Sequence, residues 1–159
     1  MIYSGTILTP SRPDEVFDLL AEPERFAPLL PDYEGMSLED PTHFTVRIVI
    51  AVAQIQGQAE LAMELCEAVR PSMVEYRGQG IMAGSQLNLG LQFHIAPCGS
   101  MSEVNWQGEF SLDGQLAFIA GGLIEPMGRK HFDRMAQRLG ANLGAEPATE
   151  IPQAPETGE

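Results

Sequence analysis

Apolar and polar residues alternate along most of the first two thirds of the chain. In Phe44–Val52 every even-numbered position is apolar, and in Ser85–Ile95 five of the six odd-numbered positions are. The same period of two recurs in Ala59–Cys66, Val74–Gly80 and Val104–Leu112. Successive side chains of a strand point to opposite faces, so each segment predicts a strand with one dry and one wet face. Together they predict a curved antiparallel sheet of about seven strands.

After residue 114 the apolar period lengthens to that of a helix. One stripe consists of Leu116, Ile119, Ala120, Leu123 and Met127, and a second consists of Phe132, Met135, Leu139 and Leu143. Pro126 lies where the two stripes change, and proline removes a hydrogen bond from a helix. The pattern therefore predicts a C-terminal helix of about 25 residues with a kink near Pro126, long enough to cross a sheet.

Two short amphipathic segments lie between the first strand, which begins at residue 2, and the alternating run. Ser11 is the predicted N-cap of the first segment, and Pro23 begins the second, which ends before Pro31. A sheet that is dry on one face must be covered, and one helix cannot fill the concave face of seven strands. The two short helices either brace the sheet or close one end of the remaining space. We expect the second.

The length and charge of the chain limit the class of protein. The 159 residues predict one domain, which we place at residues 1–144, followed by an acidic, proline-rich disordered tail at 145–159. A net charge of −13 leaves no basic footprint for nucleic acid. No apolar run of transmembrane length is present. Cys66 and Cys98 show no paired spacing, so reduced thiols of a cytoplasmic protein are expected.

Glycines interrupt the dry face of two predicted strands. Gly78 is in phase with Tyr76, and Gly108 follows Trp106 in phase. A glycine inside a strand leaves a notch or lets another element approach closely. Two interpretations remain open: the C-terminal helix packs against these notches, or they leave room for a ligand beside Tyr76 and Trp106.

The sequence shows no grouping of residues that indicates catalysis or metal binding. His43, His94 and His131 lack ligand spacing such as HxH or HExxH and are interpreted as surface or helix-end residues. The basic cluster Gly128–Arg134 either docks an acidic partner or places cations towards a helix C-terminus. We therefore predict no catalytic residue, no metal and no cofactor.

The segment TPSRPDEVFDLLAEPERFAPLLPDYEG (Thr9–Gly35) resembles the opening of the START-like superfamily, also called SRPBCC or birch-pollen-allergen-like. Its spacing P-x-x-V-F-x-L-L-x-x-P-E-x-F-x-x-x-L-P is most similar to the CoxG branch, the G subunits of carbon monoxide dehydrogenase. Further similar segments are QIQGQAELAMEL, YRGQG, VNWQGEFSLDGQLA and LIEPMGRKHFDRM, within residues 54–135. The resemblance covers about residues 1–143. It implies an α+β helix-grip fold, in which the sheet wraps around the long C-terminal helix and encloses an apolar cavity.

Members of this branch accompany molybdenum-containing carbon monoxide dehydrogenases and related hydroxylases, and help to place the enzyme at the membrane. The resemblance therefore implies a non-enzymatic accessory protein that binds a lipophilic small molecule, with a quinone as the plausible ligand. It also implies a cytoplasmic protein, peripheral at the inner face of the membrane. Members often end in a linker and an apolar anchor, and this sequence has the linker at 145–159 but no anchor. A small polyketide cyclase or aromatase and a ligand-free assembly protein are the alternatives.

The expected cavity is lined by inward positions of the sheet, the two notch glycines, the short helices and the C-terminal helix. These residues are Leu20, Phe26, Leu30, Phe44, Val46, Ile48, Leu61, Met63, Tyr76, Gly78, Leu89, Leu91, Phe93, Trp106, Gly108, Ile119, Leu123 and Met127.

Overall fold

A computed structural model describes residues 1–52, 55–82 and 84–145. The predicted tail at 145–159 lies, except for Ala145, outside the described residues. The elements in chain order are β1 (Ile2–Thr9), α1 (Pro13–Ala21), α2 (Pro23–Phe26), η1 (Ala27–Leu29), β2 (Tyr33–Asp40), β3 (His43–Val52), β4 (Ile55–Val69), β5 (Met73–Met82), β6 (Ser85–Cys98), β7 (Met101–Asp113), α3 (Gln115–Ala120), η2 (Gly121–Leu123) and α4 (Ile124–Asn142).

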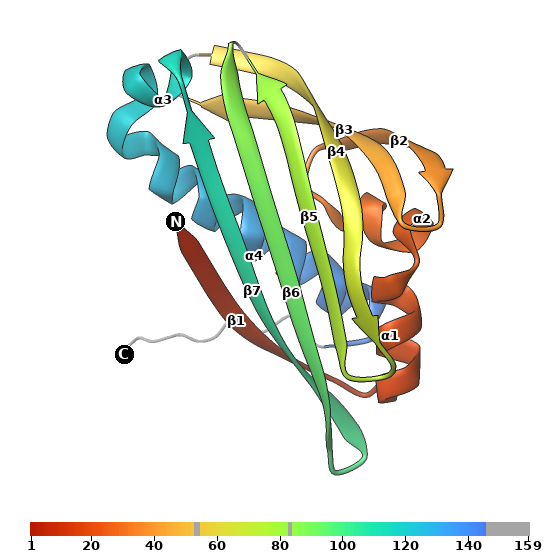
Figure 1. Ribbon diagram of the computed structural model, residues 1–159. Coiled ribbons are helices and arrows are strands. Elements are labelled where there is room, and N and C mark those ends of the chain that lie inside the picture. Colours follow the sequence, from red (N-terminus) through yellow and green to blue (C-terminus); the bar gives the residue numbers. More distant parts are fainter. Residues whose placement is uncertain (53–54, 83, 146–159) are drawn as a thin grey trace, which may run out of the picture.

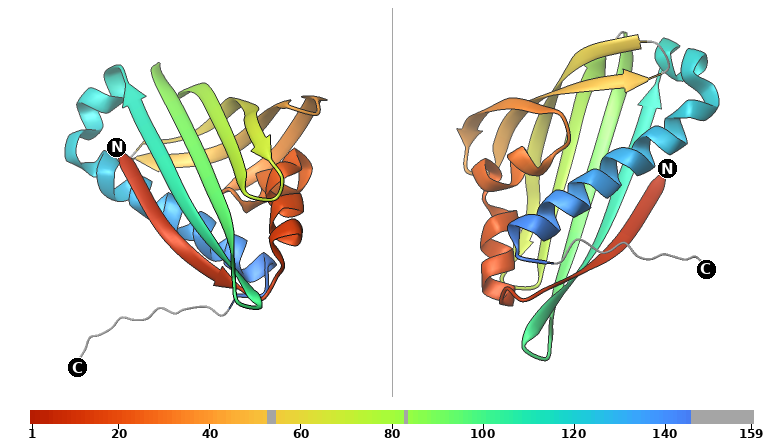
Figure 2. Two further views of the ribbon diagram at one scale, coloured as in Figure 1. Left: turned by 60° about the horizontal axis from the view of Figure 1, so that its bottom comes forward. Right: turned by 180° about the vertical axis from the view of Figure 1, so that it is seen from behind.

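The strands of the described chain form one antiparallel sheet of seven, in the order β1-β7-β6-β5-β4-β3-β2. The sheet curves around α4, which runs obliquely across its concave face, while α1 and α2 lie at one side (Figures 1 and 2). This is the helix-grip arrangement that the sequence predicts, with the short helices between the first two strands. The concave face is dry because the alternating apolar positions of the strands are buried beneath α4 and the short helices.

One strand, β2, was not located by the apolar pattern. It lies at the edge of the sheet, and most of its residues are exposed or half-buried. Its pairing with β3 is irregular at Tyr33/Gly35 and again at Leu38/Asp40. A strand that is largely wet and interrupted by bulges shows no clean alternation, so periodicity could not identify it.

The start of α1 differs from the prediction by one residue. Arg12 is the N-cap, and its backbone N–H donates to the Glu15 carboxylate at 2.8 Å. The Ser11 hydroxyl instead donates to the carbonyl oxygen of Leu143, 2.8 Å away. Ser11 therefore joins the end of α4 to the start of α1, and its prediction as the N-cap is wrong.

The C-terminal helix is interrupted at Gly121 and not at Pro126. Gly121 has φ of 53°, a left-handed conformation that glycine adopts without strain. Pro126 is the third residue of α4, where a backbone N–H has no partner within the helix, so its missing N–H costs nothing. The predicted kink near Pro126 is therefore wrong. The second apolar stripe is correct, since Phe132, Met135, Leu139 and Leu143 are buried.

Candidate ligand-binding site

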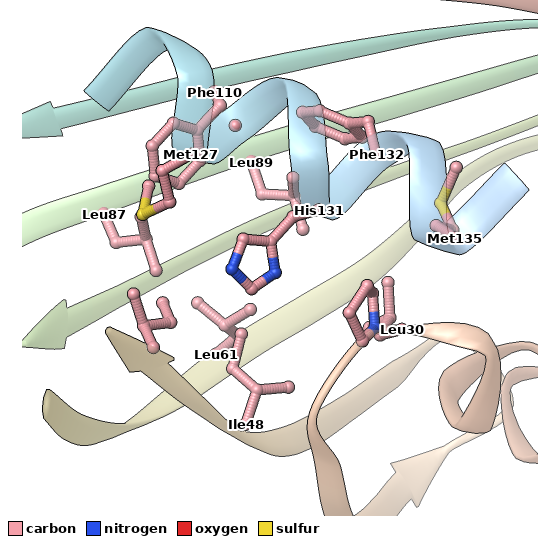
Figure 3. A pocket seen from close by; sticks show the side chains of 13 residues that line it. Leu30, Ile48, Leu61, Leu87, Leu89, Phe110, Met127, His131, Phe132 and Met135 are labelled. Atoms are coloured by element: carbon pink, nitrogen blue, oxygen red, sulfur yellow. The ribbon is translucent and has the colours of Figure 1, made fainter. Parts of the chain in front are cut away.

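An apolar cavity of about 60 Å³ lies between α4 and the concave face of the sheet (Figure 3). It is lined by Leu30, Pro31, Ile48, Ile50, Leu61, Leu87, Leu89, Phe110, Met127, Gly128, His131, Phe132 and Met135. A water molecule needs at least ~10–15 Å³ of such space, and pockets for drug-sized ligands span roughly 300–1,000 Å³. The cavity therefore accepts a small group as it stands, and a larger lipophilic ligand requires its walls to move.

The expected cavity residues divide into three groups. Leu30, Ile48, Leu61, Leu89 and Met127 line the cavity. Leu20, Phe26, Phe44, Val46, Met63, Tyr76, Gly78, Leu91, Phe93, Trp106 and Gly108 are buried in the core but do not line it. Ile119 and Leu123 are exposed by 60% and 52%, so their prediction as cavity residues is wrong; the face of α3 that is buried carries Leu116 and Ala120.

The space beside Tyr76 is filled by the short helices. The ring of Phe26 stacks on that of Tyr76, and Phe44 meets Tyr76 edge-on, with centroids 5.8 Å apart. The Tyr76 hydroxyl donates to the backbone carbonyl oxygen of Leu20 at 2.5 Å. Burial, followed by the charge of Glu22, raises the pKa of this phenol, which stays neutral. This end of the molecule is a packed aromatic cluster, with α1 and α2 attached to β5.

The space beside the notch glycines, Gly78 and Gly108, is also filled. A side chain at Gly108 would overlap the ring of Phe132 on α4, so the helix-packing interpretation is confirmed there. Phe132 stacks near Trp106, with ring centroids 6.1 Å apart. A side chain at Gly78 would meet the sulfur of Met63 on β4, a filling that the sequence did not indicate. Neither glycine leaves open space for a ligand in this conformation.

His131 is the polar cavity residue that sequence reasoning missed, and the apolar or glycine lining residues that it missed are Pro31, Ile50, Leu87, Phe110, Gly128, Phe132 and Met135. Its imidazole points from α4 towards Leu61 and Ile48, and it is the one lining side chain of the described cavity that carries nitrogen or oxygen (Figure 3). The signal was its spacing, because His131 lies four residues after Met127 and four before Met135 on the same face of a helix. It was interpreted as a surface residue because its chemistry is polar.

Burial lowers the pKa of the His131 imidazole. The carboxylate of Asp32 opposes this effect and raises the pKa, while the cations of Arg134 and Lys130 lower it. The imidazole is therefore neutral at pH 7, with one nitrogen that donates and one that accepts. The described residues offer its ring no hydrogen-bond partner.

Two polar contacts hold the loop after η1 to α4, and we call them the clasp. The guanidinium of Arg138 donates to the carbonyl oxygen of Leu30 at 3.1 Å. The guanidinium of Arg134 pairs with the carboxylate of Asp32 at 3.6 Å. Leu30 and Pro31 form part of the cavity wall, so the clasp holds one side of the cavity in place.

Other polar groups of the described chain do not form a second site. His43 is exposed and pairs with Asp40 at 3.0 Å, and His94 is exposed on the wet face of β6. Cys66 and Cys98 are exposed free thiols. Throughout residues 1–52, 55–82 and 84–145, no three potential ligand side chains gather to hold a metal ion. In the same residues, no helix has both the length and the hydrophobicity needed to cross a bilayer.

The curved sheet and the gripped helix give the chain a helix-grip, START-like fold. Solved structures of the same fold include a conserved protein from Geobacillus kaustophilus, with a TM-score of 0.77 at 12% identity over 90% of this chain and 95% of that one. A START superfamily protein from Mycobacterium smegmatis has a TM-score of 0.66 at 8% identity, over 89% and 96% of the two chains. The Zhui aromatase/cyclase from a Streptomyces species has a TM-score of 0.65 at 13% identity, over 90% and 93%.

The sequence identifies the family of the chain more closely than the fold does. The model of the CoxG family, the G subunits of carbon monoxide dehydrogenase, matches residues 5–144, and the chain belongs to this family. No curated protein matches the chain.

Proposed function

We propose that this protein binds a lipophilic small molecule without transforming it, as an accessory to a molybdenum-containing hydroxylase of the carbon monoxide dehydrogenase class. The observation that carries the proposal is the apolar cavity between α4 and the sheet in a chain of the CoxG family. Apolar walls with few polar groups favour a hydrophobic molecule over a polar metabolite. A membrane quinone fits this description, and handling it places the protein at the inner face of the membrane.

Binding a quinone requires the cavity to enlarge, and the clasp is the side where this is easiest. The sheet is held by continuous strand pairing, and α1 and α2 are fixed by the aromatic cluster around Tyr76. The loop Leu30–Asp32 is joined to α4 by one hydrogen bond and one ion pair, both partly solvated. These two polar contacts contribute little, so the main cost of separating the loop from α4 is the exposure of the buried side chains of Leu30 and Pro31.

Native mass spectrometry tests the proposal. The protein is purified without detergent and measured before and after organic extraction, and again after incubation with decylubiquinone, whose fully substituted ring adds thiols poorly. We expect a noncovalent adduct that extraction removes and decylubiquinone restores, and that disappears under denaturing conditions. A protein that takes up neither a native ligand nor decylubiquinone contradicts the proposal and supports an assembly protein with a filled core.

A cyclase or aromatase is the second candidate, and His131 is the observation that favours it. A titratable side chain inside an apolar cavity is a common feature of acid–base catalysis. The described cavity lining offers His131 no carboxylate or second histidine as a partner. Incubation with a candidate ligand, followed by chromatography and NMR of the recovered compound, distinguishes the two. A carrier returns its ligand unchanged, whereas a cyclase returns a ring-closed isomer or the product of that isomer after loss of water.

A further inference from the structure

We propose that His131 is the polar anchor of the cavity, and that it selects neutral lipophilic molecules with a carbonyl or hydroxyl oxygen over plain hydrocarbons and carboxylates. The inference rests on the proposed function and states the class of ligand. It depends on the position of the imidazole in the cavity, on its lack of a protein hydrogen-bond partner and on the charged groups around it.

The position of His131 inside the cavity is the first support. The imidazole projects from the middle of α4 into the space, facing Leu61 and Ile48 across it (Figure 3). Apart from Gly128, which has no side chain, the other lining residues among those described have side chains of carbon and sulfur only. A ligand oxygen in this cavity can therefore form a side-chain hydrogen bond with His131 and with no other lining residue.

The missing partner of the imidazole is the second support. His131 is half-buried and faces the cavity, so its ring nitrogens are open to a molecule that enters this space. In the described part of the chain, neither ring nitrogen has a protein partner. A ligand oxygen can therefore bond to the ring without breaking a contact within the protein.

The surrounding charges define the ligand further. Asp32, Arg134 and Lys130 are the charged groups that act on the ring, and Asp32 and Arg134 are paired with each other in the clasp. The neutral imidazole donates to a carbonyl or accepts from a hydroxyl with equal ease. No Lys or Arg lines the described cavity, so a carboxylate would enter an apolar space without a cation beside it, which disfavours it.

Matched probes test the anchor. Naphthalene and 2-naphthol share one ring system and differ by a single hydroxyl, and 2-naphthoate carries a carboxylate instead. None of them reacts with the exposed thiols Cys66 and Cys98, which would complicate the use of small quinones. Affinities are measured by isothermal titration calorimetry on the wild-type protein and on His131→Leu, His131→Gln and Met127→Leu. Met127→Leu is the control, because it changes the lining without removing a hydrogen-bonding group.

We expect the wild-type protein to prefer 2-naphthol to naphthalene by about tenfold, the factor that one net hydrogen bond provides. His131→Leu should abolish this preference, His131→Gln should restore part of it, and Met127→Leu should keep it. The ¹⁵N resonances of the His131 ring should shift with 2-naphthol and not with naphthalene. 2-Naphthoate should bind more weakly than 2-naphthol.

The possible failures are distinguishable. An unchanged preference for 2-naphthol in a folded His131→Leu protein overturns the anchor and leaves the proposed carrier function standing. Tighter binding of 2-naphthoate than of 2-naphthol overturns the stated ligand class. Failure of the wild-type protein to bind naphthalene, 2-naphthol and decylubiquinone overturns the proposed function and the anchor with it.

Discussion

The aromatic rings of Phe26 and Tyr76 stack with their centroids 4.2 Å apart and their planes at 6°. This contact joins α2 to the middle of the sheet. The Tyr76 hydroxyl continues the connection, because it bonds to the Leu20 carbonyl near the C-terminus of α1, where helix carbonyls lack partners. In this conformation α1 and α2 brace the sheet, and only the following residues, Leu30 and Pro31, reach the cavity wall.

Tyr76→Phe should lower the free energy of unfolding by about 1 kcal/mol, since it removes one buried hydrogen bond and keeps the stacked ring. Chemical denaturation measures the change. Tyr33→Phe is the matched control, because no partner of the Tyr33 hydroxyl is found in the described chain, and it should have little effect. Equal losses in both variants would show that the Tyr76–Leu20 bond contributes nothing.

Gly108→Ala should destabilise the protein by about 1–3 kcal/mol, because the added methyl group overlaps the ring of Phe132. Gly90→Ala is the control. Its added carbon meets Glu109 at an ordinary 3.6 Å, so the change should stay within about 0.5 kcal/mol. Combining Gly108→Ala with Phe132→Leu should give less than the sum of the two losses. Strict additivity would show that Phe132 does not fill the notch.

The pH dependence of stability should report His131. The pKa of His131 is lowered in the folded protein. As the pH falls below the unfolded pKa near 6.5, the unfolded chain therefore binds a proton at this residue more readily than the folded chain does. Stability should therefore fall with decreasing pH in this window, and His131→Leu should remove that part of the fall. The contribution of His43 to the pH dependence has the opposite sign, because bonding to Asp40 raises its pKa. This contribution is the same in the wild-type protein and in His131→Leu, so it cancels in the comparison. Parallel stability curves for the wild-type protein and His131→Leu would contradict the prediction.

Weakening the clasp should open the cavity wall. Arg138→Ala removes the bond to the Leu30 carbonyl, so hydrogen exchange of the Leu30 amide, which bonds to the Ala27 carbonyl, should accelerate by about tenfold, while Leu87–Phe93 in β6 stays slow. Association with decylubiquinone should also become faster. Arg129→Ala is the control, because Arg129 pairs with Glu125 on the same helix. Unchanged exchange at Leu30 in Arg138→Ala would place the opening elsewhere.

The sequence predicted the sheet and the gripping helix because both depend on one property, the face on which apolar residues recur. It could not locate β2, whose residues are mostly wet, or the helix break, since Pro126 and Gly121 both interrupt helices and only position decides between them. The notch at Gly108 was visible, but its filling by Phe132 depends on two segments that are distant in sequence.

The candidate site was predicted less well than the fold. Inward positions of the sheet were identified correctly, but periodicity does not distinguish a core position from a cavity wall. Phe44 and Ile48 lie in the same phase of β3, and only Ile48 lines the cavity. His131 was overlooked because polarity was taken as a sign of exposure, although its spacing from Met127 placed it on the inner stripe.

The pairing of β1 with β7 determines the order in which the molecule can be completed. Ile2 lies opposite Glu109, so the backbone groups of β1, the first strand synthesised, are paired only after β7, the last strand, has been made. Strands β2 to β6 can form as successive hairpins while the chain emerges from the ribosome. Until Met101–Asp113 and α4 have followed, the nascent protein exposes an open strand edge and an uncovered apolar face, which are the features that promote aggregation. A delay in translation after β6 should therefore be the interval in which this protein depends most on chaperones.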